Sequence, residues 1–334
     1  MKIWFPVIRA HTGTDVFSRR LAEALGRWGI CAEITWFPSR YEFFPFVLRS
    51  ERPPAGTQII HANSWSGFAF ARYGIPLVVT EHLNVLDPAY RPYKNRAQAT
   101  YHTVFVRRFM KASFAAAAAI TAVSDFVRSS LAQRLNIHAQ TIPNWIDTRL
   151  FRPGAARPAR RSTRFRLLFS ANPSRRKGAD LLVRIMEELG AEFELHFTLG
   201  PGGRNPIAPA PNITPIARVA CDPDLVAVYR RADALLLPTR FEGFGLAALE
   251  AMACGKPVVA TDCCSLPEVV GDGSGGILCP LDDVEAFAAA CRRLARDPPL
   301  RAKLSAGARE RAEKLFAEQC VIPQYLAVYE KLLR

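Results

Sequence analysis

Two glutamates separated by seven residues, Glu242 and Glu250, flank a glycine-rich turn in this 334-residue chain. Gly243 and Gly245 in the turn let the backbone come close to a ligand, because glycine has no side chain to hold it away. The amides of residues 245–247 open a helix, and a helix N-terminus attracts an anion such as a diphosphate. The pattern indicates an anion site with two carboxylates at different depths. An ordinary turn with a surface glutamate is the alternative.

A basic loop forms a second group of residues suited to chemistry. Residues 171–178 read ANPSRRKG and precede an expected helix over Ala179–Leu189. Lys177, with Arg175 or Arg176, can therefore meet a phosphate at a helix N-terminus. A solvated basic turn is the alternative.

The elements around the two glutamates form one strand–loop–helix–strand unit. The apolar run 234–237 ends at Pro238 and predicts a buried parallel strand. Helix-forming residues fill 246–253, Gly255 provides a stop, and residues 258–260 resume a strand. Such a unit places the loop at the carboxyl end of a sheet, where open α/β folds bind their ligands.

The segment from Glu242 to Glu250, EGFGLAALE, is followed by MACGKPVVATD over residues 252–262. These residues resemble the signature of the retaining glycosyltransferases of family 4, the group 1 glycosyl transferases, which have the GT-B fold. The resemblance implies that Glu242 lies beside the donor sugar and that the Gly-Phe-Gly backbone contacts the sugar and the diphosphate. It assigns Glu250 to the ribose hydroxyls of the nucleotide.

The basic loop resembles the same family with one departure. Lys177 matches the family lysine that neutralises the diphosphate. Asn172 stands where the family commonly has an arginine, so Arg175 or Arg176 would have to supply the missing charge.

The N-terminal half carries weaker matches. His82, at the end of an expected strand, matches a histidine that contacts the donor sugar in the family. The loop over residues 9–14 is implied to close over the reaction centre, with His11 as a site candidate or part of a plain polar turn. The resemblance thus assigns catalysis to Glu242, Lys177 and His82, and donor binding to Gly13, Asn172, Arg175, Arg176, Lys177, Gly243, Phe244, Gly245, Leu246, Ala247 and Glu250.

Chain length predicts about two domains. The resemblance implies an α/β fold, GT-B, with two Rossmann-like domains whose parallel sheets face a central cleft. We expect an acceptor-side domain over residues 1–150 and a nucleotide-sugar-binding domain over 164–315. Residues 151–163, rich in Ala, Arg and Pro, predict a linker. A C-terminal helix over 316–334 is expected to cross back to the first domain.

The first half begins with an expected strand, Lys2–Ile8. Asp15 is expected to cap a helix over Val16–Trp28. A helical stretch over Ser66–Tyr73 and one long helix over 97–118 follow.

Residues 36–50 hold six aromatic side chains together with Arg40 and Arg49. Aromatic residues mixed with arginine suit a membrane interface or an amphipathic acceptor. Burial beneath the N-terminal domain is the favoured alternative.

The net charge is +14, and residues 1–150 hold 18 basic against 9 acidic residues, a balance of +9. Such an excess suits nucleic acid, anionic lipid or a phosphorylated substrate. No nucleic-acid-binding motif accompanies the charge, so no nucleic acid is expected as a partner.

The eight cysteines lack the spacing of a zinc site and are expected to be reduced structural thiols. Neither a metal nor a cofactor is expected. No apolar run approaches the ~20 residues of a spanning helix, and the first residues do not resemble a secretory signal. The expected location is cytoplasmic, with peripheral binding to the inner face of the cell membrane as a further expectation.

The sequence therefore predicts a retaining, metal-independent glycosyltransferase that uses a UDP- or GDP-sugar. Its acceptor is expected to be a hydroxyl of a glycan or a lipid-linked molecule in surface polysaccharide or lipopolysaccharide biosynthesis. Two alternatives stay open: a nucleotide-sugar hydrolase or epimerase, and a non-catalytic binding module on a membrane surface.

Overall fold

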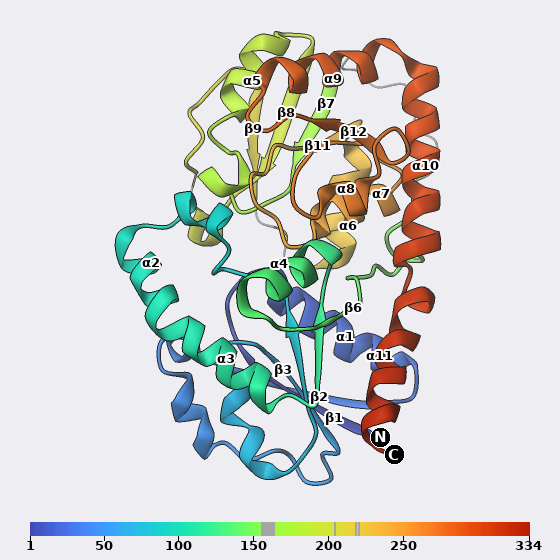
Figure 1. The fold of residues 1–334 in the computed structure, drawn as a ribbon. Helices are drawn as coiled ribbons and strands as arrows, with labels where there is room; N and C mark the ends of the chain where they lie inside the picture. The colour runs from blue at the N-terminus through green and yellow to red at the C-terminus, as the bar shows by residue number, and fades with distance from the viewer. Residues whose placement is uncertain (155–163, 204, 218, 220) are drawn as a thin grey trace. The chain divides into compact units, whose positions relative to one another are not determined.

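The computed structural model describes residues 1–154, 164–203, 205–217, 219 and 221–334. The chain divides into two compact units. Unit 1 comprises Met1–Asn144 together with Gln319–Arg334, and unit 2 comprises Trp145–Glu318 (Figure 1). The linker expected over 151–163 falls largely on residues 155–163, which lie outside the described residues.

Unit 1 is built on a sheet of six parallel strands in the order β2-β1-β3-β4-β5-β6. The central strands are rich in Ile and Val and are buried, as expected of a parallel sheet covered on both faces. The strands are β1 (Lys2–Ile8), β2 (Cys31–Phe37), β3 (Ile59–Asn63), β4 (Leu77–Glu81), β5 (Ala119–Ala122) and β6 (Gln140–Thr141). Strand order reverses between β1 and β3, which makes their carboxyl ends a switch point of the type that binds ligands.

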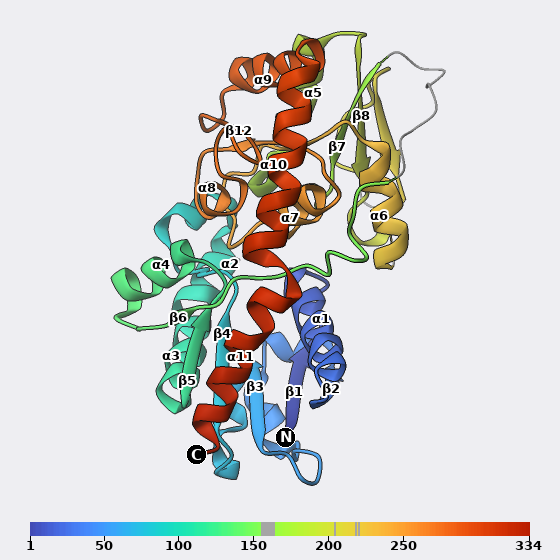
Figure 2. The same ribbon diagram turned by 90° about the vertical axis from the view of Figure 1, so that its right-hand side faces the viewer.

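Five α-helices in the described part of unit 1 accompany this sheet: α1 (Gly13–Arg27), α2 (Arg96–Tyr101), α3 (Arg107–Ala116), α4 (Asp125–Leu135) and α11 (Glu318–Leu332, which joins unit 1 from Gln319). Figure 2 shows α11 running along the sheet. Tyr329 of α11 contacts His61 of β3, with 2.7 Å between the hydroxyl and Nδ1. His61 Nε2 lies 2.6 Å from the Thr80 hydroxyl of β4. A buried polar chain therefore fixes the last helix to the middle of the sheet.

The start of α1 differs from the expectation. The helix begins at Gly13 and its N-cap is Thr12, whose side chain accepts from the amide of Thr14. Asp15 is not the cap, because its carboxylate accepts instead from the amides of Ala10 and His11, at 3.0 and 2.8 Å. Asp15 therefore holds the preceding loop in place rather than starting the helix.

The single helix expected over 97–118 is helical without a break from Arg96 to Ala116, but it is not a regular α-helix throughout. A π-helical turn, His102–Val106, separates α2 from α3, and the amide of Arg107 bonds to the carbonyl of His102. The stretch expected as a helix over Ser66–Tyr73 is two short 3-10 turns. Gly67 disfavours a helix there, and Gly74 ends the segment at a φ of +65°.

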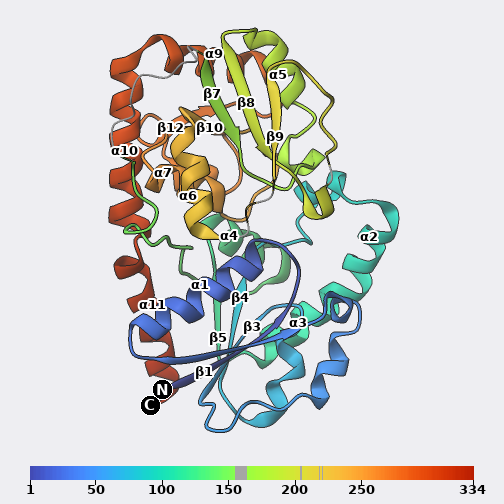
Figure 3. The same ribbon diagram turned by 180° about the vertical axis from the view of Figure 1, so that it is seen from behind.

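Unit 2 repeats the plan with six parallel strands in the order β12-β11-β10-β7-β8-β9 (Figure 3). The strands are β7 (Phe165–Phe169), β8 (Phe193–Thr198), β9 (Ile213–Ile216), β10 (Ala234–Leu237), β11 (Val258–Thr261) and β12 (Gly276–Cys279). The helices of its described residues are α5 (Leu182–Leu189), α6 (Asp222–Arg231), α7 (Leu246–Ala253), α8 (Leu266–Val270), α9 (Val284–Arg296) and α10 (Pro298–Phe316). α5 starts three residues later than expected, because Gly178 has a φ of +73° and residues 178–181 form a turn.

One hydrophobic cluster of unit 2 joins its sheet to α5 and α9. Phe169 of β7, Leu236 of β10 and Phe287 of α9 are all fully buried in it. The order of the strands reverses between β7 and β10, which are neighbours although β8 and β9 separate them in the chain. The loops that follow β7 and β10 therefore leave the sheet side by side at the switch point.

Candidate active site

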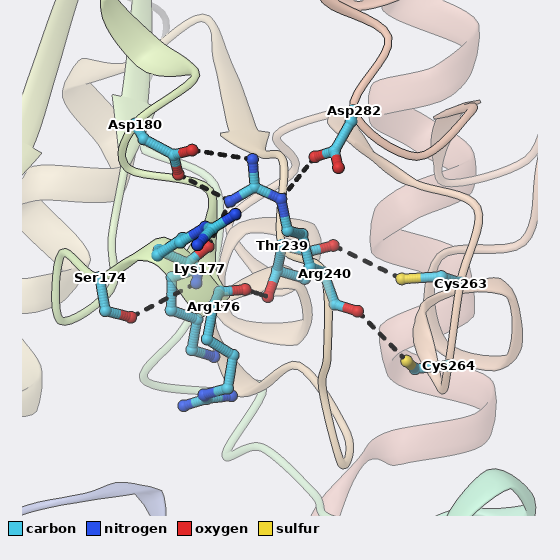
Figure 4. Close-up of polar contacts among 10 residues, drawn as sticks. Ser174, Arg176, Lys177, Asp180, Thr239, Arg240, Cys263, Cys264 and Asp282 are labelled. Carbon is cyan, nitrogen blue, oxygen red and sulfur yellow. Dashed lines mark hydrogen bonds and ion pairs between the residues drawn. The ribbon is translucent and has the colours of Figure 1, made fainter. Parts of the chain in front are cut away.

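The switch point of unit 2 brings together the two loops that carry the predicted donor-binding residues. Residues 170–181 follow β7 and residues 238–245 follow β10. The backbone amide of Arg240 donates to the carbonyl of Arg176 at 2.8 Å, so the loops are bonded to each other directly. Figure 4 shows this region.

Lys177 and Glu242 form an ion pair across the two loops. Both side chains are largely shielded, with 16% of Lys177 and 14% of Glu242 exposed. Burial lowers the pKa of Lys177, although the carboxylate beside it acts in the opposite direction. Burial would raise the pKa of Glu242, but the charges of Lys177 and Arg176 outweigh it and hold that pKa below its ordinary value. The pair is ionised, and a ligand that brought its own charges could exchange partners with either member.

Arg176 lies beside this pair. Its guanidinium donates to the backbone carbonyl of Phe241 at 2.7 Å, next to Glu242 in the chain. Arg175 and Asn172 are exposed instead. Of the two arginines in the loop, Arg176 is thus the one fixed close to the Lys177–Glu242 pair.

Two glycines permit the close approach of the loops. A Cβ on Gly178 would lie 1.9 Å from the carbonyl oxygen of Pro238, and the residue has a φ of +73°. Gly245 has a φ of +97°, and its Cβ would meet Leu266 at 2.9 Å. Any other residue at these positions would push the basic loop or the start of α7 out of place.

The N-terminus of α7 lies at the end of the same loop. Gly245 is its N-cap, Leu246 and Ala247 are its first residues, and Gly243 and Phe244 before them are buried. The first amides of a helix have no acceptor within the helix, and the helix dipole makes this end attractive to an anion. Glu250, in the second turn, is 6% exposed and accepts a hydrogen bond from the Tyr229 hydroxyl at 2.8 Å.

Arg240 ties the site together and was missed by the sequence reasoning. Its guanidinium donates to both carboxylate oxygens of Asp180 at 2.7 and 2.9 Å, and to Asp282 at 2.5 Å. It also donates to the carbonyl of Arg175 at 2.5 Å. Through Arg175 and Asp180, Arg240 thereby holds the basic loop (residues 171–178) and the turn after it in place. The available signal was an arginine two residues before Glu242, in the loop that follows β10. Its partners lie 60 and 42 residues away in the chain.

Gly13 and His82 belong to the other compact unit. Gly13 is the exposed first residue of α1, and His11 before it has a φ of +55°. His82 follows β4, lies edge-on to Phe17 at 4.5 Å between ring centroids, and lines a small cavity with Phe17 and Asn63. Burial lowers the pKa of His82 to about 3, so its imidazole is neutral at pH 7.

The residue before His82 is also buried and titratable. Glu81 is 3% exposed, and its carboxylate accepts from the amide of Leu83 at 3.2 Å. Burial raises the pKa of Glu81 to about 7, against the hydrogen bonds from Ser64 and from the backbone. The structure thus gives this unit a second ionisable group at the end of β4.

Comparison with known proteins places the chain in a family. A family model described as "Glycosyl transferases group 1" matches residues 164–297, and one described as "Glycosyltransferase Family 4" matches residues 11–150. The D-inositol 3-phosphate glycosyltransferase of Saccharomonospora viridis is 33% identical over 323 residues, covering 86% of this chain and 73% of that protein. The chain belongs to glycosyltransferase family 4. Another relative of this glycosyltransferase is the MMP alpha-(1->4)-mannosyltransferase of Mycolicibacterium hassiacum, 30% identical over 90% of this chain and 77% of that protein.

Solved structures share the fold of this glycosyltransferase. Sucrose-phosphate synthase from Thermosynechococcus elongatus superimposes with a TM-score of 0.80 at 21% identity, over 99% of both chains. Anabaena HepE, solved in complex with UDP-glucose, gives a TM-score of 0.77 at 15% identity, over 99% of this chain and 100% of that one. The two parallel sheets and these neighbours confirm the predicted GT-B fold.

Among the described residues, no three His, Cys, Asp or Glu side chains gather where they could hold a metal ion. Within the same part of the chain, no helix is both long enough and apolar enough to cross a membrane.

Proposed function

We propose that this glycosyltransferase transfers a sugar, with retention of anomeric configuration, from a UDP- or GDP-sugar to a hydroxyl of a glycan or lipid-linked acceptor. The observation that carries the proposal is the shielded Lys177–Glu242 pair at the switch point of unit 2, beside Arg176 and the N-terminus of α7. The site offers cations and helix amides for a diphosphate, and a carboxylate for sugar hydroxyls.

The proposed step breaks the bond between the anomeric carbon and the diphosphate oxygen while an oxocarbenium-like centre forms. Lys177, Arg176 and the first amides of α7 stabilise the negative charge that grows on the departing diphosphate. The acceptor hydroxyl attacks the same face, and its proton passes to the leaving phosphate oxygen. No enzyme nucleophile is needed. The depressed pKa of Glu242 fits this role, because it favours the ionised carboxylate, which can accept hydrogen bonds from sugar hydroxyls, and lowers its nucleophilicity.

The remaining roles follow from position. Glu250 lies in the second turn of α7 and would accept hydrogen bonds from the ribose hydroxyls, taking over from the Tyr229 hydroxyl. Arg176 rather than Arg175 would contact the diphosphate, because Arg176 is the one held beside the pair. The family role of His82, contact with the donor sugar, stays a prediction, as does that of Gly13.

The setting of the reaction is proposed from the sequence. We propose a role in surface polysaccharide or lipopolysaccharide biosynthesis, at the cytoplasmic side of the cell membrane and without a metal or other cofactor. Two relatives are named for glycosyl transfer to D-inositol 3-phosphate and for mannosyl transfer. These names support an acceptor that offers a hydroxyl group on a polar molecule. The UDP-glucose complex of HepE supports a nucleotide-sugar donor.

The proposal is tested by screening UDP- and GDP-sugars for thermal stabilisation and then for transfer. A donor at about a hundred times its dissociation constant should add about 2.7 kcal/mol to the free energy of unfolding. Nuclear magnetic resonance of the product should then show the anomeric configuration of the donor. Inverted configuration would contradict the proposal. Release of free sugar or of an epimer without acceptor would favour the hydrolase or epimerase, and donor binding without turnover would favour a binding module.

A further inference from the structure

The exposed apolar side chains of the chain are concentrated in two segments of unit 1. Among the described residues, ten large hydrophobic side chains are exposed, and six of them lie in residues 43–47 and 104–105. These six form what we call the apolar patch: Phe43 (57% exposed), Phe44 (57%), Phe46 (50%), Val47 (43%), Val104 (37%) and Phe105 (48%). The expected burial of the 36–50 segment is therefore wrong for most of its apolar tip, although Phe37 and Leu48 are buried.

The two segments form one continuous surface. Tyr101 links them: its ring centroid lies 5.5 Å from that of Phe43 and 5.7 Å from that of Phe105. Its hydroxyl donates to the carbonyl of Glu42 at 2.6 Å. The turns of residues 39–50 accordingly lie beside the α2–α3 segment, as Figures 1 and 3 show.

Val104 and Phe105 lie on the solvent side of the α2–α3 segment. His102 and Val106, at the two ends of the π turn, are buried, whereas residues 103–105 between them are all exposed. The buried residues His102, Val106 and Met110 recur at every fourth position, so they share the inner face of the segment and leave Val104 and Phe105 on the outer one. Two large apolar side chains thus face solvent, in contact through Tyr101 with those of the other segment.

The charges around the patch have one predominant sign. Across residues 39–50 and 96–111 there are six exposed basic side chains, Arg40, Arg49, Arg96, Arg107, Arg108 and Lys111. The same residues contain one acidic side chain, Glu42. Burial, together with the charge of Asp15, raises the pKa of Glu42 to about 7, so it is only partly ionised at neutral pH.

We propose that the apolar patch and its six basic neighbours dock this protein on the surface of an anionic lipid membrane. Aromatic rings insert at the boundary between headgroups and acyl chains, and basic side chains around them attract anionic headgroups. The excess of positive charge selects lipid over an uncharged apolar partner. The docking surface does not depend on the donor site, because none of its residues belongs to unit 2.

The test is sedimentation of the full chain with vesicles of phosphatidylcholine alone or mixed with phosphatidylglycerol. We expect binding to the mixed vesicles only, weakening as salt rises. The double variant Phe44→Ser, Phe46→Ser should abolish binding to the mixed vesicles. Each of the single variants Arg107→Ala, Arg108→Ala and Lys111→Ala should lower the partition coefficient for these vesicles roughly fivefold. Trp28→Ser, which removes an exposed aromatic side chain outside the patch, is the matched control and should bind like the unaltered chain.

Insertion of the apolar patch into the membrane is measured separately with the variant Phe44→Trp. Its added fluorescence should shift to the blue on mixed vesicles, while circular dichroism and nucleoside diphosphate titration show that each variant is folded. Equal partitioning to both vesicle types, no binding to either, or full binding by the Phe44→Ser, Phe46→Ser variant would overturn the proposal. No binding to either vesicle by a chain that still transfers sugar would leave the proposed reaction intact and point to a protein partner for the patch.

Discussion

The carboxyl edges of the two sheets differ in the ionisation of the side chains that they hold. In unit 2 the edge holds ionised groups in pairs, Lys177 with Glu242 and Arg240 with Asp180. In unit 1 the corresponding edge suppresses charge through burial: the pKa of His82 falls to about 3, so its imidazole is neutral at pH 7, and that of Glu81 rises to about 7, so its carboxyl is only partly ionised there. Ion pairs can exchange partners with an anionic ligand, whereas neutral polar groups suit uncharged hydroxyls. This difference supports our proposal that the diphosphate binds to unit 2.

The first test of this contrast disturbs the spacing of the unit 2 loops. Gly178→Ala should lower transfer about 100-fold, because its Cβ would overlap the Pro238 carbonyl and displace Lys177, and small misplacements cost about that much. Gly190→Ala is the matched control: its φ is +74°, but nothing lies within 4 Å of its Cβ. Steady-state kinetics on both variants checks this. If both variants lost the same fraction of transfer activity, the loss would come from backbone strain alone and not from displacement of Lys177.

The second test asks whether unit 2 also recognises the nucleotide. Glu250→Ala should weaken nucleoside diphosphate binding by roughly 10- to 150-fold, the equivalent of a charged hydrogen bond of about 1.5–3 kcal/mol. Tyr229→Phe removes only the hydroxyl that holds Glu250 and should cost less than Glu250→Ala. Isothermal titration calorimetry measures both. Unchanged affinity in Glu250→Ala would remove this residue from the donor site.

The third test concerns the carboxyl edge of the unit 1 sheet. A raised carboxyl pKa means that the folded state holds its proton more tightly than the unfolded state, so stability is lost as pH rises toward about 7. Between pH 5 and 7 the free energy of unfolding should fall by roughly 2 kcal/mol because of Glu81. Glu81→Gln should remove that part of the decline, while Glu51→Gln, at an exposed site, should not.

Urea unfolding at several pH values measures the difference between variant and unaltered chain. Taking the difference matters because the pKa of Glu42 is also raised, and its contribution is common to all three proteins. Parallel pH profiles for Glu81→Gln and the unaltered chain would show that folding does not raise the pKa of Glu81, and would weaken the contrast between the two edges.

The smallest effect on the rate of transfer is expected from Arg240, which holds the basic loop in place. Arg240→Met removes the hydrogen bonds to Asp180 and Asp282 without touching Lys177, and should lower transfer about tenfold through looser positioning. Arg292→Met breaks a comparable pair with Glu188 elsewhere in unit 2 and serves as the control. A merely structural role for Arg240 would lower the melting temperature and leave kcat unchanged in the folded fraction.

Sequence reasoning reached those parts of the molecule that short-range patterns determine. The strand ending at Pro238, the glycine-rich turn and α7 are adjacent in the chain, and apolar runs and glycines locate them. The contact of Lys177 with Glu242 and the hydrogen bonds of Arg240 join residues 42 to 65 positions apart, so no local pattern predicts them.

The errors in unit 1 have a similar cause. Asp15 has the residue type of a helix cap, but it is needed to bind two amides of the loop before it. The apolar residues at 43–47 suggested burial, but only tertiary packing decides which side chains of a short turn are covered. The π turn after Tyr101 left no signal in the composition of the 97–118 segment.

The central claim is that Lys177 stabilises the departing diphosphate, and the most direct measurement is kcat for sugar transfer by Lys177→Ala. Lys303→Ala, at an exposed position of α10, is the control, and the melting temperature confirms that both variants are folded. The account predicts that kcat falls about 100- to 1,000-fold with a smaller change in KM, because the charge that Lys177 meets grows only in the transition state. Full activity of a folded Lys177→Ala variant would contradict it.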